Sequence, residues 1–183
     1  GPAEFFAGIP GTLGGALAMN AGAFGGETWR HVLDVETIDR RGVRRKRAAA
    51  EFKVGYRSVV APGAEGYLAA RLEFEYRPEA HQDEIRALLE RRRQSQPIGA
   101  WSGGSTFTNP QGDHAARLID TAGLKGFRVG GASVSTKHAN FFVNEGTATA
   151  RDLEELIQHV QRTVERVHGV HLEPEVQIIG EPA

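Results

Sequence analysis

Three short stretches of the sequence hold side chains that could carry chemistry. "GYRSV" places Tyr56 beside Arg57, "GSTFTNP" places Ser105 after a glycine pair, and "LEPEV" places Glu175 next to Pro174. A guanidinium can clamp a carboxylate or a phosphate, and a hydroxyl or carboxyl group can transfer a proton. Each residue also has an ordinary explanation: a surface arginine, a turn serine, and a glutamate facing water on the edge strand that a proline favours. Taken singly, these residues leave the chemistry open.

Hydrolase and metal chemistry find no support in the sequence. Ser105 is not enclosed in a G-x-S-x-G nucleophile motif, because Thr106 and Phe107 follow it. "STKHANFFVN" offers a histidine, but no second histidine lies at a metal-ligand spacing, and the chain has no cysteine. We therefore expect no metal site, and we interpret Lys137, His138 and Asn140 as polar loop residues.

The glycine-rich opening, "AGIPGTLGGALAMNAGAFGGE", is a candidate for binding a pyrophosphate. Closely spaced glycines let backbone N–H groups approach phosphate oxygens. The spacing matches neither the G-x-G-x-x-G dinucleotide fingerprint nor the G-x-x-x-x-G-K-[ST] phosphate loop. A tight loop that packs a helix explains the glycines equally well.

Composition bounds the class of protein. The chain has 183 residues, 40% of them hydrophobic, which suits one good-sized domain or two small ones. No apolar run approaches the roughly 20 residues of a membrane span, and no basic secretion signal opens the chain. We expect a soluble, cytoplasmic protein without a membrane partner. The initial Gly1-Pro2 resembles a protease-cleavage scar, so we also expect a fragment.

A basic run lies between Arg40 and Arg47 and could contact nucleic acid phosphates. No aromatic residue is interleaved with it, and the formal net charge of the chain is only -1. A solvated hairpin explains the run better than a nucleic-acid surface. No nucleic acid partner is expected.

Hydrophobic periodicity and breaker residues predict an α+β domain rather than a doubly wound sheet. The clearest helix follows Thr149, which forms a capping box with Asp152, and ends at Gly169. We expect other helices at 13–19, 79–96 and 113–122. We expect strands on both sides of the turn at Arg41-Gly42, at 66–76 with Leu68, Ala70, Leu72, Phe74 and Tyr76 on one side, around Gly130-Gly131, and at 170–180. The segment 97–112 is expected to be an irregular loop.

Taken together and in this order, five segments resemble the UDP-N-acetylenolpyruvoylglucosamine reductase family. They are "AGIPGTLGGALAMNAGAFGGE", "GYRSV", "GSTFTNP", "AGLKGFRVGGASVSTKHANFFVN" and "LEPEVQIIG". The resemblance implies the branch without a substrate-covering insertion, truncated at its N-terminus. It also implies that residues 1–78 are the C-terminal part of a PCMH or vanillyl-alcohol-oxidase-like FAD-binding domain, and that residues 79–183 form an α+β substrate-binding domain.

The resemblance implies a two-electron reduction in peptidoglycan precursor synthesis. In the family, NADPH reduces FAD, and UDP-N-acetylglucosamine enolpyruvate then replaces the nicotinamide. Hydride passes from flavin N5 to C3 of the enolpyruvyl group, and a proton added at C2 gives UDP-N-acetylmuramate. Such a site needs a cation and an acid near the substrate carboxylate and a proton donor over C2.

Residue roles follow from the matched motifs. By the family pattern, Arg57 and Glu175 polarise the substrate carboxylate, and Ser105 protonates C2. Tyr56 and Asn109 contact flavin or substrate, and Arg93 faces the substrate diphosphate. The implied flavin contacts are Gly8, Ile9, Pro10, Gly11, Thr12, Gly14, Gly15 and Asn20.

Other functions remain open from the sequence alone. The family's upstream flavin segment, with its phosphate loop, is missing, so about half of a flavin site is expected here. The chain could therefore be a nucleotide-sugar binding module without redox activity of its own. A nucleic-acid-binding domain using the basic run is a remote third alternative. We expect a monomer.

Overall fold

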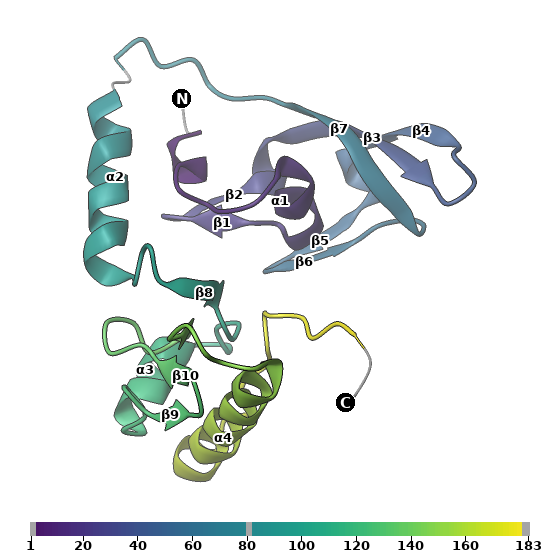
Figure 1. The fold of residues 1–183 in the computed structure, drawn as a ribbon. Coiled ribbons are helices and arrows are strands. Elements are labelled where there is room, and N and C mark those ends of the chain that lie inside the picture. The colour runs from purple at the N-terminus through teal and green to yellow at the C-terminus, as the bar shows by residue number, and fades with distance from the viewer. Residues whose placement is uncertain (1–2, 80–81, 181–183) are drawn as a thin grey trace. The chain divides into compact units, whose positions relative to one another are not determined.

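Two hydrophobic cores form along this chain, one in each half. The computed structural model describes residues 3–79 and 82–180. By its internal contacts the chain divides into unit 1, Gly1–Arg91, and unit 2, Arg92–Ala183 (Figure 1). Each core draws its buried residues from one unit only. The fold mixes helices and sheets, as the sequence predicts, whereas the assignment of 1–78 and 79–183 to two functional domains stays a prediction.

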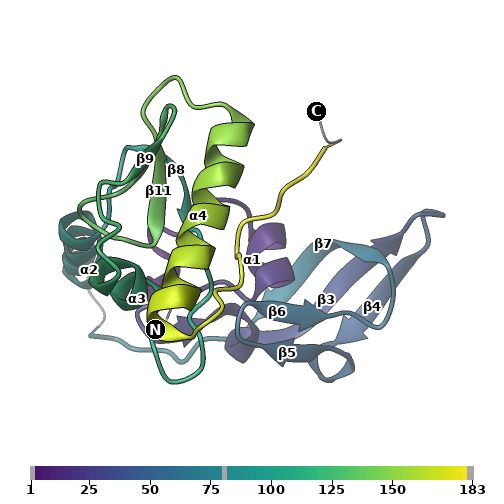
Figure 2. The same ribbon diagram turned by 90° about the horizontal axis from the view of Figure 1, so that it is seen from below.

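Unit 1 is built on a three-stranded antiparallel sheet in the order β4-β3-β7, with two small hairpins, β1-β2 and β5-β6. Figure 2 shows β7, β3 and β4 side by side. The elements are η1 Glu4–Phe6, α1 Leu13–Met19, β1 Gly22–Ala23, β2 Gly26–Glu27, η2 Thr28–His31, β3 Val32–Asp39, β4 Arg44–Ala48, η3 Ala49–Glu51, β5 Lys53–Gly55, β6 Ser58–Val60, β7 Glu65–Leu72 and α2 Gln82–Ser95, whose last four residues belong to unit 2. The predicted helix at 13–19 and the hairpin at Arg41-Gly42 are confirmed.

The core of unit 1 lies between α1 and the sheet. Leu17 of α1 packs with Trp29, Val35 and Phe52. The Trp29 indole donates a 2.7 Å hydrogen bond to the carbonyl oxygen of Leu17, so its polar edge is satisfied inside the core. This packing fixes the end of α1 against the sheet.

The predicted face of β7 is wrong at Leu68. Thr37 pairs with Tyr67 and Glu36 with Ala69, so Leu68 is an extra residue in a β-bulge. The bulge moves the inward position to Tyr67, which packs on the core, and leaves Leu68 46% exposed. The strand also ends at Leu72 and not at residue 76.

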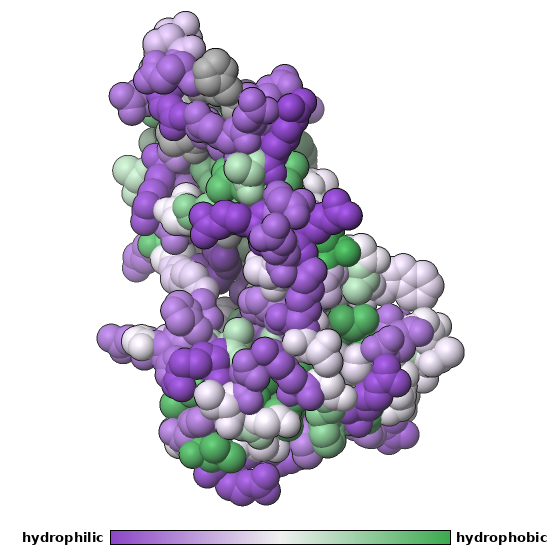
Figure 3. All heavy atoms as spheres, turned by 90° about the vertical axis from the view of Figure 1, so that its left-hand side faces the viewer, coloured by the Kyte–Doolittle hydropathy of each residue, from purple (hydrophilic) through white to green (hydrophobic). Residues whose placement is uncertain are grey.

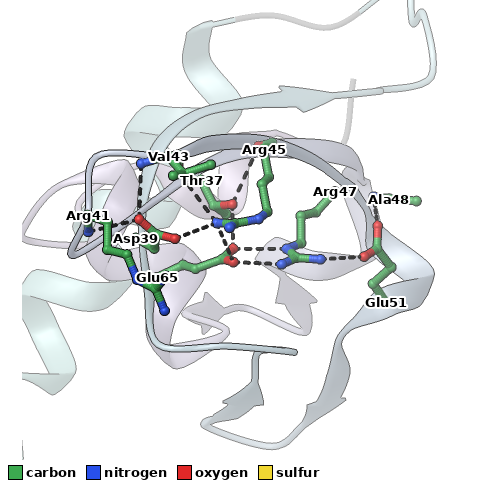
Figure 4. Close-up of polar contacts among 9 residues, drawn as sticks. All are labelled: Thr37, Asp39, Arg41, Val43, Arg45, Arg47, Ala48, Glu51 and Glu65. Carbon is green, nitrogen blue, oxygen red and sulfur yellow. Dashed lines mark hydrogen bonds and ion pairs between the residues drawn. The ribbon is translucent and has the colours of Figure 1, made fainter.

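Carboxylates on the sheet form ion pairs with several arginines of the basic run (Figure 4). The Arg47 guanidinium donates through Nε and Nη2 to the Glu65 carboxylate, at 2.9 and 2.6 Å. Thr37 donates a further hydrogen bond to Glu65, whose side chain is only 5% exposed. Arg45 reaches Glu65 and Asp39. The predicted hairpin is confirmed, and these cations are structural partners of its sheet.

Unit 2 has an antiparallel sheet in the order β8-β11-β10-β9, packed against two helices. Its elements are β8 Trp101–Ser105, α3 Ala115–Thr121, β9 Arg128–Val129, β10 Ala132–Val134, β11 Phe141–Asn144 and α4 Ala150–His168. The core residues are Phe107, Ala115, Leu118, Ile119, Leu124, Ala132, Val134, Ala139, Phe142, Leu156, Ile157, Val160, Val164 and Leu172. The predicted capping box and the Gly169 stop of α4 are confirmed.

Two expectations for unit 2 are wrong. The segment expected to be a loop contains β8, because its backbone pairs with β11 despite a turn-like composition. The expected strand at 170–180 is absent, and only Pro174 forms an antiparallel backbone pair, with Phe107. In both places the pairing partner is far away in sequence, so local composition cannot reveal it.

Hydrophilic residues predominate on the face of the molecule shown in Figure 3, and hydrophobic residues form small separate patches there. In residues 3–79 and 82–180, no helix has the length and apolar character that a membrane span requires.

Candidate functional site

Arg57 lies at the tip of the β5-β6 hairpin in unit 1. Its backbone has a φ of 51°, a left-handed conformation that is uncommon for a residue with a β-carbon. Its guanidinium donates to the carbonyl oxygens of Gly22, at 2.9 Å, and Asn20, at 3.4 Å. It also lies 5.1 Å from the centre of the Tyr56 ring, within the range of a cation-π contact. The structure thus brings the predicted residues Tyr56, Arg57 and Asn20 together.

Asn20 ties the end of α1 to this hairpin. It caps α1 with a φ of 45° and is 1% exposed. Its Nδ2 donates to the carbonyl oxygen of Gly55 at 3.0 Å, and its Oδ1 accepts from the Trp29 backbone N–H at 3.1 Å. The side chain predicted to line a flavin is therefore engaged inside unit 1.

Gly22 is a residue of this region that the sequence reasoning did not single out. A β-carbon added there would lie 2.4 Å from the Gly26 carbonyl oxygen and 3.3 Å from Nη1 of Arg57. The absence of a side chain therefore lets the Arg57 guanidinium reach the Gly22 carbonyl. The sequence does not reveal this role, because Gly22 is one of several closely spaced glycines and nothing in their spacing distinguishes it from the others.

The glycine-rich segment before α1 has an open backbone. Thr12 caps α1, its Oγ1 accepting from the Gly15 N–H at 3.2 Å, and Gly11 has a φ of 105°. A β-carbon on Gly14 or Gly15 would meet only the Thr12 hydroxyl, at 3.7 Å. Packing among the described residues therefore does not require glycine at these two positions. The predicted contacts Gly8, Ile9 and Pro10 precede this segment, and Gly8 and Pro10 are exposed.

Ser105 and Glu175 are brought together in unit 2 by backbone hydrogen bonds. The Glu175 N–H donates to the carbonyl oxygen of Thr106 at 2.8 Å, and Thr106 directly follows Ser105. On the same edge of this segment, the Thr108 N–H donates to the carbonyl oxygen of Glu173 at 2.9 Å. Segments 69 residues apart therefore lie side by side at the end of β8.

Asn140 fixes the other edge of this segment. It is 3% exposed, its Oδ1 accepts from the Phe107 N–H at 3.0 Å, and its Nδ2 donates to the Phe107 carbonyl oxygen at 2.8 Å. Its own carbonyl oxygen accepts from the Thr106 N–H at 2.8 Å. Asn140 lies in the turn before β11, as expected for a polar loop residue, but its side chain is buried and fully engaged. The usable signal was an asparagine inside the apolar run "ANFFV", where an amide must find partners.

A groove of about 310 Å³ adjoins the segment after β8. Its lining includes Gly103, Thr106 and Phe142, α4 contributes Ala150, Leu153, Glu154 and Ile157, and the remaining lining residues are Val176, Gln177, Ile178 and Ile179. Its lining is mainly apolar, with few polar groups. Thr106, which accepts the hydrogen bond from the Glu175 N–H, is thus one of the residues that line the groove.

The predicted substrate contacts have distinct surroundings. Asn109 accepts a 3.0 Å hydrogen bond at Oδ1 from the Ala115 N–H, at the start of α3. Arg93 is exposed, and the Lys137 ammonium donates to its carbonyl oxygen. The neighbouring Arg92 is partly buried, its Nε donates to Gln96 at 2.9 Å, and its buried Nη1 has no hydrogen-bond partner among the described residues. Burial lowers the pKa of the Arg92 guanidinium.

Groups of three or more His, Cys, Asp or Glu side chains that could hold a metal ion do not occur within residues 3–79 and 82–180. His138 is partly buried next to Asn140, and its Nδ1 accepts from the Asn140 N–H at 3.3 Å. Burial lowers the pKa of this imidazole, which suits the neutral, accepting form.

Comparison with known proteins links these features to one family. Residues 96–179 match the family model described as UDP-N-acetylenolpyruvoylglucosamine reductase, C-terminal domain. The chain is 60% identical over 180 residues to the UDP-N-acetylenolpyruvoylglucosamine reductase of Alkalilimnicola ehrlichii, covering 98% of this chain and 60% of that protein. The enzyme of the same name from Methylococcus capsulatus is 58% identical over 180 residues, with 98% and 59% covered.

A solved structure gives the same result. The crystal structure of UDP-N-acetylenolpyruvylglucosamine reductase from Thermus caldophilus superimposes with a TM-score of 0.84 at 38% identity, covering 97% of this chain and 64% of that one. The chain thus spans about 60% of the length of these curated relatives. The family match expected from the five motifs is confirmed: the chain belongs to the UDP-N-acetylenolpyruvoylglucosamine reductase family.

Proposed function

We propose that this chain serves the NADPH-dependent, FAD-mediated reduction of UDP-N-acetylglucosamine enolpyruvate to UDP-N-acetylmuramate. The observation that carries the proposal is the 2.8 Å hydrogen bond from the Glu175 N–H to Thr106, which places Glu175 beside the residue that follows Ser105. The names of the relatives support the same reaction. The protein would act in the cytoplasm as a monomer.

FAD fits the open glycine segment of unit 1. Gly14 and Gly15 leave space where side chains would otherwise project, so a bound group could approach the backbone of this turn closely, with the Gly15 N–H already donating to Thr12. We propose that unit 1 holds the remainder of a PCMH-like flavin domain and that Gly8 to Gly15 contact the cofactor. Asn20 would contribute indirectly, because its side chain is engaged with Gly55 and Trp29. When bound, the flavin would supply the hydride.

Arg57 would stabilise the negative charge that develops on the substrate carboxylate during the reaction. A guanidinium stays protonated at physiological pH and presents several parallel donors. Here two carbonyl oxygens fix its direction before substrate arrives, so little reorganisation is needed when the charge appears. Glu175 would assist at the same carboxylate, and Tyr56 would contact flavin or substrate.

Ser105 would deliver the proton to C2. A serine hydroxyl is a weak acid, so the transfer requires a strongly basic carbanion-like centre and a hydroxyl held in place. The backbone of Ser105 is held by its pairing with Phe141 in β11. Asn109 and the Arg92–Arg93 pair would contact the rest of the substrate, and the unpaired Nη1 makes Arg92 the better candidate for an anionic group.

The test is flavin absorbance of the purified protein after incubation with FAD, followed by NADPH oxidation that depends on the enolpyruvyl substrate. Retained yellow colour together with substrate-dependent oxidation is the expected result. Binding of the nucleotide sugar without flavin retention would instead favour a binding module without redox activity. Flavin retention with no response to the substrate would overturn the assigned reaction.

A further inference from the structure

We propose that Asn140 is a positioning residue for Ser105 and Glu175, its side-chain amide taking the place of a neighbouring strand. The inference rests on the proposed function, which gives those two residues their roles. Asn140 contacts the backbone of Thr106 and Phe107, through which it would act.

The end of β11 explains why an amide is needed at this place. Pairing of β11 with β8 continues, through a register shift between Val143 and Phe141, as far as Phe141 and Ser105. Before Phe141 the chain turns, because the Phe141 N–H bonds back to the carbonyl oxygen of His138 at 3.0 Å. No strand continues there to meet the N–H and C=O of Phe107, which is 1% exposed. An asparagine side chain offers one acceptor and one donor in a plane, as a peptide group does.

Asn140 thereby holds one edge of the segment whose other edge receives Glu175. The Thr106 N–H points to the Asn140 carbonyl oxygen, and the Thr106 carbonyl oxygen accepts from Glu175. A shift of Thr106 would move the Ser105 hydroxyl and the Glu175 backbone together. Misplacement of reacting groups by about 1 Å can cost on the order of a hundredfold in rate.

Asn144, at the other end of β11, provides a matched control. Its Oδ1 accepts from the Gly146 and Ala148 N–H groups, at 2.8 and 3.1 Å, and these are the hydrogen bonds of its side chain within the described residues. An aspartate there could accept both. At Asn140 an aspartate could accept from Phe107 N–H but could not, as a carboxylate, donate to the Phe107 carbonyl oxygen. The same substitution should therefore disrupt the hydrogen bonds at Asn140 and preserve them at Asn144.

The experiment compares Asn140→Asp with Asn144→Asp in the flavin-loaded protein by stopped-flow absorbance of both half-reactions. Asn140→Asp should slow flavin reoxidation by the enolpyruvyl substrate roughly tenfold to a hundredfold at saturating substrate, and leave flavin reduction by NADPH unchanged within about twofold. Asn144→Asp should change neither. Equal losses in the two half-reactions of Asn140→Asp, or no loss in either, would overturn the positioning role.

Amide hydrogen exchange gives a second readout that requires neither flavin nor substrate. In Asn140→Asp, exchange over 105–108 and 173–176 should accelerate by roughly tenfold or more, while α4 stays protected as in Asn144→Asp. Unchanged exchange in these two segments would also overturn the inference. If the native protein fails to reoxidise its flavin with substrate, the proposed function fails, and the exchange result still decides whether Asn140 holds the segment. Asn140→Ser carries no buried charge and replaces Asn140→Asp if the latter does not fold.

Discussion

Two buried asparagines, Asn20 in unit 1 and Asn140 in unit 2, hold the backbone next to residues with a proposed catalytic role. Each uses both ends of its amide on backbone groups, Asn20 on Trp29 and Gly55 and Asn140 on Phe107. Near Asn20, the functional side chain itself is anchored, because the Arg57 guanidinium bonds to two carbonyl oxygens. Near Asn140, the anchoring that the structure describes is on the backbone.

The difference follows from side-chain length. A guanidinium is separated from its backbone by four rotatable bonds, so fixing the backbone does not fix its direction, and it needs contacts of its own. A serine hydroxyl is one bond beyond the β-carbon, so a fixed backbone leaves it only a rotation. The two regions should therefore respond to different kinds of substitution. In unit 1 the sensitive changes are those that alter the contacts of the functional side chain, and in unit 2 they are those that release the backbone beside it.

The largest effect is expected for Ser105→Ala. Loss of a positioned proton donor should slow flavin reoxidation by substrate by about 10²- to 10⁴-fold and leave flavin reduction by NADPH nearly untouched. Stopped-flow measurement of each half-reaction separates the two. Losses of similar size in both half-reactions would remove Ser105 from the proton-donor role and leave Glu175 to carry the chemical part proposed for unit 2.

Arg57→Lys tests the anchored side chain of unit 1. Lysine keeps the charge but lacks the planar fork that reaches the Gly22 and Asn20 carbonyl oxygens. We expect the rate of flavin reoxidation at saturating substrate to fall roughly tenfold to a hundredfold, with thermal stability changed far less. A fully active lysine variant would show that charge alone suffices and that the two carbonyl contacts do not matter for the reaction.

Asn20→Ala tests the anchor behind Arg57. The change leaves the buried Trp29 N–H and the Gly55 carbonyl oxygen without their partner. We expect the free energy of unfolding to fall by about 2 to 4 kcal/mol. Urea denaturation followed by tryptophan fluorescence measures it, since Trp29 lies in the same core. A loss well under 1 kcal/mol would mean that water replaces the amide and that Asn20 is not the anchor of this region.

The smallest effect is expected for the stability of unit 1 in acid. It depends on Glu65, a carboxylate that is paired within the sheet of unit 1. Hydrogen bonds from Arg47 and then Thr37 lower the pKa of Glu65 to about 2, from an ordinary value of 4.5. The folded-state pKa is lowered, so this carboxylate stabilises unit 1 above pH 4.5, and that contribution disappears as the pH falls from about 4.5 to about 2. Thermal melts across this range should show it.

Glu65→Gln provides the control for that measurement. The amide does not titrate, so the variant should lose less stability than the native protein between pH 4.5 and pH 2 and should be the less stable of the two at pH 7. Parallel pH profiles for the two proteins would show that the contacts in Figure 4 are not maintained in solution.

Local signals in the sequence were sufficient wherever a helix or hairpin is fixed by near neighbours. The capping box of α4, its apolar stripe and the Gly169 stop all lie within one segment, as does the turn between β3 and β4. Strand β8, the bulge at Leu68 and the pairing of Phe107 with Pro174 depend on distant partners. They could not be read from composition.

The candidate site shows the same division. The motifs located Arg57, Ser105 and Glu175 by type, while the residues that hold them, Asn140 and Gly22, emerged only from their contacts. Asn20 was singled out as a flavin contact, but its hydrogen bonds tie α1 to the hairpin. Spacing along the chain identifies reactive groups more readily than the residues that support them.

At Arg57, the left-handed backbone conformation lowers stability, while the side chain is the one that the proposed reaction requires. A residue with a β-carbon pays roughly 1 to 2 kcal/mol for this conformation, and glycine does not. On the backbone alone, glycine would be preferred there, but it would remove the guanidinium. A variant stabilised by relieving this backbone strain would therefore lose the arginine, so any stabilised variant of the protein must be screened for turnover as well as for melting temperature.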